Sequence, residues 1–249
     1  MAPRIRVFDT DPDAAPKPRP VSDIVGRFRS GKQEAGNPVA LDAWRVTTGD
    51  PDVAAAIASR MGGEVAEWDT EKEDNLEVET DKAAVKVIIS GTDAVEFDLK
   101  LWNQGELIHH CDGVAYLSSD APEEIGQPCG CPESFADRKD LAKRKRGPRP
   151  DTRVVFRLAD APELGKFEMR SGSWDLVRAL PEYLNAMEDA DDEGNGVTAT
   201  LKLEEVAFIA KSGPRKGKPV TYKKPTLTGY KPYNGPALDD DGYGEEPPF

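Results

Sequence analysis

The chain has 249 residues and a net charge of −13, with 38% hydrophobic and 32% charged residues. No apolar run approaches the roughly 18–20 residues that cross a bilayer, which excludes a membrane-spanning helix, and the acidic balance excludes a protein that binds DNA through its whole surface. Three cysteines, an odd number, and an N-terminus without the apolar stretch of a signal peptide predict a cytoplasmic protein rather than a secreted one.

Both ends of the chain are predicted to be disordered. Residues 1–20 form a flexible arm, in which Pro, Asp, Ala and Lys bury too little apolar area to fold. Residues 229–249 form an acidic tail that is rich in Gly and Pro. A single core domain therefore spans residues 21–228, and a Cys/His and basic segment, residues 106–150, is inserted in it.

The start of the core partly matches a phosphate-binding P-loop. Gly26, Gly31 and Lys32 have the required spacing, but Gln33 stands where the motif needs Ser or Thr to hold magnesium. A P-loop also opens a helix, whereas residues 36–38, Gly-Asn-Pro, interrupt the chain. Nucleotide binding is therefore not expected.

Two segments have the features of helices. In residues 51–61 the apolar positions follow helical spacing, Asp50 is a suitable N-cap, Pro51 fits the first turn, and Gly62-Gly63 ends the helix. A second helix is predicted over residues 174–187, where Pro181 introduces a kink.

Most other apolar segments alternate with a period of two, which is typical of strands. Val95, Phe97 and Leu99 face one way while Glu96 and Asp98 face the other. Strands are predicted over residues 64–69, 76–80, 83–90, 95–102, 153–158, 165–170, 197–206 and 220–224. Since strands predominate without a regular βαβ rhythm, we predict an α+β fold with an antiparallel-rich sheet and two main helices.

All the cysteines and histidines lie between residues 109 and 131. Thiolate and imidazole suit zinc, which prefers four tetrahedral ligands. If residues 107–111 are extended, His109 and Cys111 share a face and His110 points away. We therefore predict a structural zinc held by Cys111, Cys129, Cys131 and His109, with His110 as the substitute.

Two other interpretations of this cluster stay open. The three thiols are reduced and hold no metal, or the zinc is catalytic and uses Asp112, Glu123 or Glu124 as a base.

Two basic runs are candidate contacts for DNA or protein, although a solvated charged surface is an equal alternative. The run beside the cluster includes Lys143, Arg144, Lys145, Arg146 and Arg149, and the later run includes Lys216 and Lys218. Aromatic residues, at 7%, are too sparse for a base-stacking platform. The four tryptophans, Trp44, Trp68, Trp102 and Trp174, are interpreted as core anchors.

The chain ends in an acidic run followed by Pro247, Pro248 and Phe249. Such a tip can dock in an apolar pocket ringed by Arg or Lys. It resembles the acidic C-terminal tip of bacterial single-stranded DNA-binding proteins, which recruits replication and repair enzymes. A tail that only keeps the protein soluble is the alternative.

Several short motifs together resemble a known family over about residues 21–210. They are Gly26-Arg27-Phe28-Arg29-Ser30-Gly31, Pro38 through Leu41, Trp44-Arg45-Val46-Thr47-Thr48-Gly49-Asp50, Gly62-Gly63 with Val65 and Trp68, Cys111-Asp112-Gly113, Cys129-Gly130-Cys131-Pro132, Thr152-Arg153 after Pro150, and Phe156-Arg157-Leu158. The chain resembles the recombination directionality factor-like proteins of actinobacterial (Streptomyces-type) temperate phages, which are accessory factors of large serine integrases.

The resemblance implies a protein that is not an enzyme. It would bind the phage serine integrase on attachment-site DNA and switch it from integration to excision of the prophage, in the cytoplasm of the host bacterium. The family pattern also implies four thiolates, and this chain has Gly147 where relatives place the fourth cysteine. Either His109 or His110 then supplies the fourth ligand, or the site is weakened or empty.

Two further classes of function compete with this interpretation. One is an accessory factor, similar to single-stranded DNA-binding proteins, that recruits host enzymes through its tail. The other is a zinc-dependent hydrolase, which is the least favoured because no convincing base, nucleophile or phosphate loop accompanies the cluster.

Overall fold

The computed structural model describes residues 23–34, 36–68, 70, 74–190, 196–210, 216–236 and 238. The predicted arm, residues 1–20, and the tail residues Pro247, Pro248 and Phe249 lie outside these ranges. The described elements are the strands β1 (Ile24–Glu34), β2 (Asn37–Thr48), β3 (Val65–Glu67), β4 (Leu76–Glu79), β5 (Ala84–Ile89), β6 (Val95–Asn103), β7 (Glu106–Cys111), β8 (Tyr116–Ser118), β9 (Arg149–Leu158), β10 (Lys166–Ser171), β11 (Val197–Ile209) and β12 (Pro219–Pro232), the helices α2 (Pro51–Met61), α3 (Phe135–Lys143) and α4 (Trp174–Ala190), and the 3-10 turns η2 (Thr92–Ala94), η3 (Pro122–Glu124) and η4 (Pro162–Leu164).

The strands form one large, mostly antiparallel sheet with the order β12-β11-β5-β9-β10-β1-β2-β4-β3. Among the described strands only β1 and β10 pair in parallel. Strand β9 is the centre of the arrangement, because it pairs with β10, β5 and β6, and β7 and β8 follow β6. The predicted α+β class with an antiparallel-rich sheet is confirmed.

Residues 26–33, which partly match a P-loop, lie within strand β1. This strand forms a hairpin with β2, and Gly36, with a φ of 80°, lies in the connecting turn. The Gly-Asn-Pro segment therefore lies where the chain reverses between two strands that were not predicted from the sequence. Gly31 lies at an irregularity of the hairpin, where an added Cβ would stand 2.7 Å from the Val39 carbonyl oxygen.

Helix α2 has the predicted limits because its caps are encoded locally. The Asp50 carboxylate accepts hydrogen bonds from the backbone N–H groups of Asp52 and Val53, at 2.8 and 3.4 Å. At the other end, Gly62 has a φ of 78° and donates its N–H to the Ala58 carbonyl. The buried side chains Val53, Ala54, Ile57 and Met61 pack on the sheet.

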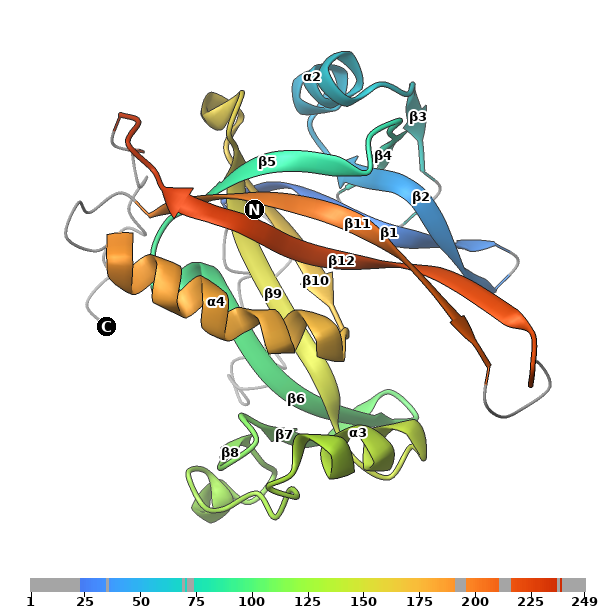
Figure 1. Ribbon diagram of the computed structural model, residues 1–249, viewed down its shortest axis with the longest axis vertical. Helices are drawn as coiled ribbons and strands as arrows, with labels where there is room; N and C mark the ends of the chain where they lie inside the picture. Colours follow the sequence, from blue (N-terminus) through green and yellow to red (C-terminus); the bar gives the residue numbers. More distant parts are fainter. Residues whose placement is uncertain are drawn as a thin grey trace, which may run out of the picture.

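Helix α4 covers another part of the same core (Figure 1). It runs from Trp174 to Ala190 with Pro181 inside it, so the helix continues beyond this proline. Its Tyr183 side chain is buried and donates a hydrogen bond to the Gly91 carbonyl at 2.7 Å. Between the helices and the sheet, the Phe28 ring makes edge contacts with Trp44, Phe156 and Phe167.

The two longest strands near the C-terminal end of the described core, β11 and β12, form a hairpin that extends past its neighbour. Strand β11 pairs with β5 only over residues 197–202, whereas its pairing with β12 continues to Ile209 (Figure 1). Strand β12 ends at Pro232, beyond residue 228, at which the sequence places the end of the core.

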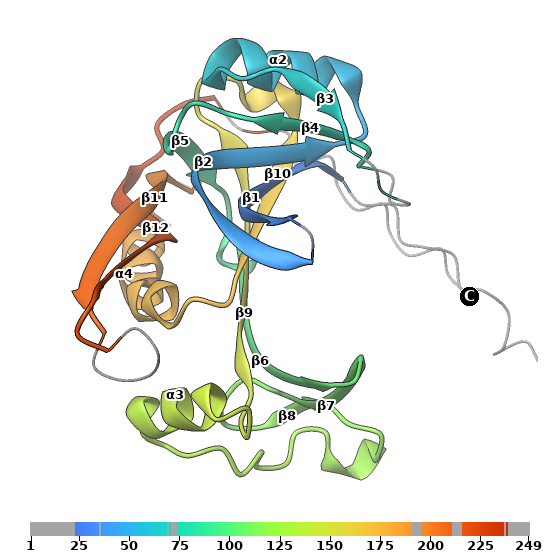
Figure 2. The same cartoon turned by 90° about the vertical axis from the view of Figure 1, so that its right-hand side faces the viewer.

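A third helix, α3, was not predicted from the sequence. It belongs to a small lobe at the end of β6 and β9 that stands apart from the main sheet (Figure 2). We call residues 101–149 the lobe; it includes β7, β8, η3 and α3. A second hydrophobic cluster, built on Leu99, Cys111 and Cys129, holds it together. No described helix is both long and apolar enough to span a membrane.

Candidate metal centre

The second hydrophobic cluster contains the three cysteines that the sequence selects as metal ligands, and His109 lies beside them. The donor atoms of His109, Cys111, Cys129 and Cys131 lie within 4.8 Å of one another. Cys111 and Cys129 are buried, and the other two are half-buried. His110 is not part of this group and contacts Ser118 and Asp98 instead.

Strand β7 positions the first two donors through its period of two. Strands β6, β7 and β8 form a branch of the sheet that we call the small sheet. Strand β6 pairs Leu99 with Cys111 and Leu101 with His109, so these side chains share one face of the small sheet. The other two donors flank Gly130, whose φ of 68° permits a sharp turn. The Cys129 N–H donates to the Val114 carbonyl at 2.9 Å, which attaches this turn to the segment after β7.

Helix α3 fixes the outer side of the cluster. Ser134 caps the helix by accepting a hydrogen bond from the Asp137 N–H. The Arg138 guanidinium then donates to the carbonyls of Pro132 and Gly113, the second at 2.7 Å. Arg138 therefore ties the Cys129–Cys131 turn to the loop after Cys111. This role of Arg138 could not be predicted from the sequence, because its two acceptors are backbone atoms brought close only by the fold.

The distances between donors fit a tetrahedral metal. Zn–S bonds of about 2.3 Å and Zn–N bonds of about 2.0 Å give tetrahedral edges of about 3.8 Å between sulfurs and about 3.5 Å between sulfur and nitrogen. The Cys111–Cys131 Sγ atoms are 3.7 Å apart, and His109 Nε2 lies 3.1 and 3.4 Å from the Sγ atoms of Cys111 and Cys131. This donor set can hold a metal ion.

Burial shifts the pKa values of three of the four donors. Burial raises the pKa of the Cys111 thiol, and the nearby Cys131 thiol raises it further. Burial likewise raises the pKa of the Cys131 thiol. The pKa of His109 is lowered, mainly by burial and to a smaller extent by the nearby His110. Without a cation Cys111 and Cys131 are therefore protonated thiols at neutral pH and His109 is uncharged, and a metal would bind by displacing the thiol protons.

Two of the three carboxylates offered as catalytic bases, Asp112 and Glu124, have other partners. Asp112 accepts hydrogen bonds from the Val114 and Ala115 N–H groups at 2.7 and 2.8 Å, and the bonds from Ala115 and then Val114 lower the pKa of its carboxyl. Glu124 accepts a hydrogen bond from the Ser119 hydroxyl at 2.7 Å. These bonds shape the loops of the lobe.

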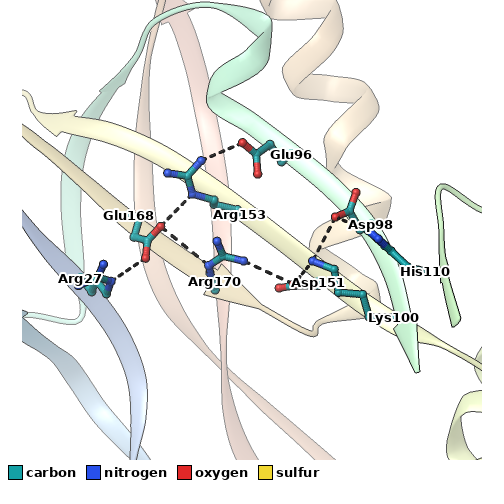
Figure 3. A network of polar contacts seen from close by, with 9 residues as sticks. All are labelled: Arg27, Glu96, Asp98, Lys100, His110, Asp151, Arg153, Glu168 and Arg170. Atoms are coloured by element: carbon teal, nitrogen blue, oxygen red, sulfur yellow. Dashed lines mark hydrogen bonds and ion pairs between the residues drawn. The ribbon is translucent and has the colours of Figure 1, made fainter. Parts of the chain in front are cut away.

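His110 belongs to a polar network on the opposite face of the small sheet. Its Nδ1 is 2.8 Å from Ser118 Oγ and its Nε2 is 3.0 Å from Asp98 Oδ2. Lys100 bridges Asp98 and Asp151, and Arg170 connects Asp151 with Glu168. Figure 3 shows this chain of contacts passing from His110 in the lobe to Glu168, Arg153, Glu96 and Arg27 in the main sheet.

The other predicted contacts are spread over separate elements. Lys143 ends α3, Arg144, Lys145 and Arg146 follow it, and Arg149 begins β9; all five are exposed. Lys216 and Lys218 are exposed just before β12. The tail contacts Pro247, Pro248 and Phe249 lie outside the described residues.

The interpretation of Trp102 as a core anchor is wrong. Its side chain is 59% exposed at the end of β6, next to a register shift in the β6–β7 pairing. Trp44 is fully buried in the main core, and Trp174 packs on the second cluster. Trp68 is half-buried, with the Arg45 guanidinium 4.5 Å from its ring centroid.

Position 147 has no space for the cysteine that the family pattern implies. A Cβ added to Gly147 would lie 2.8 Å from the Leu141 Cβ on α3. In this chain the residue that lies with the three cysteines is a histidine, His109.

Comparison with known proteins identifies the family of the chain. A family model described as Gp3-like, recombination directionality factor-like, matches residues 25–228, which include the main sheet, the lobe and the donor cluster. No solved structure matches the chain. The chain therefore belongs to the recombination directionality factor-like family.

Proposed function

We propose that the chain binds a large serine integrase of its phage and switches that enzyme from integration to excision of the prophage. The observation that carries this proposal is the family match over residues 25–228. A switch of this kind needs different affinities for two arrangements of the integrase on DNA, because equal binding would leave their populations unchanged. The chain would act as a binding protein in the host cytoplasm and leave strand cleavage to the integrase.

The metal centre has a structural role in this proposal. Zinc would be held by His109, Cys111, Cys129 and Cys131, which supply a full tetrahedral set. A catalytic zinc keeps one position open for water, and four protein donors leave none. The metal would join strand β7 to the Cys129–Cys131 turn and so keep the lobe folded.

The test is a recombination assay with purified components. The full chain is added to the integrase of the same phage, together with DNA carrying either the phage and bacterial sites or the two hybrid sites. We expect recombination of the hybrid sites to rise and integration to fall, while the chain alone leaves the DNA uncut. An integrase whose direction does not change would contradict the proposal, and so would DNA cleavage by the chain alone.

A further inference from the structure

The lobe carries an unusual share of the exposed apolar side chains. Among the residues that the structure describes, ten large apolar side chains are exposed, and five of them lie between residues 102 and 125. These five are Trp102, Ile108, Val114, Leu117 and Ile125. Since large exposed apolar groups cost free energy in water, their concentration in one short segment indicates a binding surface.

These side chains are supported by neighbouring backbone segments. Trp102 lies on β6, Ile108 on β7 and Leu117 on β8, which pair in that order. Ile125 bridges Tyr116 at the start of β8, and the Val114 carbonyl accepts the Cys129 N–H. The paired strands and the donor cluster therefore hold the backbone segments that carry these apolar groups next to one another before any partner binds.

The charge of the same segment restricts the kind of partner. Residues 101–137 contain no Lys or Arg. All seven acidic residues of the segment are exposed: Glu106, Asp112, Asp120, Glu123, Glu124, Glu133 and Asp137. A segment that exposes apolar groups and carboxylates but no cation repels DNA phosphates and complements a protein surface that is basic and apolar.

We propose that this acidic apolar surface of the lobe is where the chain binds the integrase. The inference rests on the proposed function, because the partner is the integrase itself. A recombinase that holds DNA must present cationic surfaces to neutralise phosphates, so it offers the required charge. Trp102 and Ile108 are the central anchors, and the carboxylates set orientation and rate of association.

One other occupant of the lobe surface, and one other surface that could bind the integrase, are considered by the same criteria. A second copy of the chain could use its residues 138–149, which contain seven basic residues and one acidic residue. The end of the β11–β12 hairpin also exposes Phe208, Ile209 and Tyr222. The hairpin end carries Lys216 and Lys218 and has no acidic residue between Val206 and Tyr222, so it lacks the charge that a basic partner needs.

The experiment measures the affinity of the full chain for the cognate integrase at low and high salt. The test variant is Trp102→Ala with Ile108→Ser, and the control is Ile209→Ser on the hairpin. Ile108 and Ile209 are matched, since their side chains are 54% and 57% exposed. We expect the test variant to bind at least about tenfold more weakly and the control to stay within about twofold of the unchanged chain.

A charge-reversal variant keeps the test independent of folding. Glu106→Lys with Glu123→Lys alters two exposed side chains and no buried one. This variant should also bind more weakly at low salt. Its affinity should fall less between low and high salt than the affinity of the unchanged chain does. Circular dichroism and metal content identify any variant that has lost its fold.

The outcomes separate this assignment from the proposed function. If the unchanged chain binds the integrase and both lobe variants bind equally well, the lobe assignment fails alone. A loss of affinity in the Ile209→Ser control would place the site on the hairpin, and self-association that the lobe variants abolish would make a second copy the occupant. Either result overturns the assignment. If the unchanged chain does not bind the integrase, both proposals fail.

Discussion

Glu168 is the acidic residue at the centre of the polar face of the main sheet. Its side chain is only 9% exposed, and it accepts hydrogen bonds from Arg27 at 2.7 Å and from Arg153 at 2.8 Å. Burial alone would raise the pKa of its carboxyl, but the hydrogen bonds from Arg153 and Arg27 outweigh it and lower the pKa below the ordinary value of 4.5. A carboxylate in this position stabilises the fold as long as it is ionised.

Replacing Glu168 by Gln should lower the free energy of unfolding by about 1–3 kcal/mol at neutral pH, because two guanidinium groups lose their charged acceptor. Since the folded pKa is lowered, the contribution is present above pH 4.5 and is lost as pH falls through the folded value. The difference between the two proteins should therefore shrink in acid. Urea denaturation at neutral and acidic pH measures it.

The control for this prediction is Glu96→Gln. Glu96 accepts a hydrogen bond from the same Arg153 at 2.8 Å, but its side chain is 54% exposed. Exposed pairs contribute about 0–1 kcal/mol, so this variant should differ little from the unchanged chain. Equal losses from both variants would mean that burial of Glu168 has no special effect.

At the residue scale, the sequence contained the identity of the donors but not of their supports. Because side chains alternate between the two faces of a strand, the sequence was enough to place His109, and not His110, beside the cysteines. In contrast, the partners of His110, Asp98 and Ser118, lie on different strands and are common residue types without a spacing signal. Contacts across strands could not be predicted before the pairing was known.

At the scale of elements, local signals decided which predictions succeeded. Helix α2 begins and ends at the predicted residues because Asp50 and Gly62 encode its caps. Helix α3 escaped prediction because its sequence is dominated by charged residues and buries only Ala142. Strands β1 and β2 escaped as well, since β1 alternates Phe28 with Arg27 and Arg29 inside a segment that resembles a nucleotide-binding motif.

The two hydrophobic clusters predict that the lobe depends on metal while the main sheet does not. Removing the metal with a chelator should loosen β7, β8 and α3, because Cys111 and Cys129 then lose the bond that joins their segments. The core around Phe28 and Trp44 contains no donor residue and should keep its structure. Hydrogen exchange, resolved by peptide, would detect faster exchange confined to the lobe.

A histidine pair supplies the matched control for metal removal. His109→Ala should lower the metal content and reproduce the exchange pattern of the chelated protein, whereas His110→Ala should retain the metal, since its ring faces Asp98 and Ser118. Purified protein without metal, or equal metal loss in both variants, would contradict the assignment.

At the scale of the whole molecule, the order of strands could not be read from the sequence. Strand β9 pairs with β5, β6 and β10, and β1 lies beside β10 in parallel although more than a hundred residues separate them. Periodicity shows which residues are buried but does not show which strands are neighbours. The lobe follows from this topology, because the β6–β9 pairing carries residues 101–149 away from the main sheet (Figure 2).

The division into main sheet, lobe and tail predicts where the switching activity resides. The family match ends at residue 228, so the activity shared with the family should belong to the described core. Deleting residues 245–249, which include Pro247, Pro248 and Phe249, should leave integrase binding and the change of direction within about twofold of the full chain, because the deletion removes none of the lobe. The same deletion should remove any capture of host replication or repair proteins, as expected for an acidic tip that docks in a cationic pocket. The recombination assay and a pull-down from host extract, run on the same preparations, measure both effects. If the shortened chain no longer changes the direction of recombination, the tail acts on the integrase and the activity cannot be assigned to the core alone.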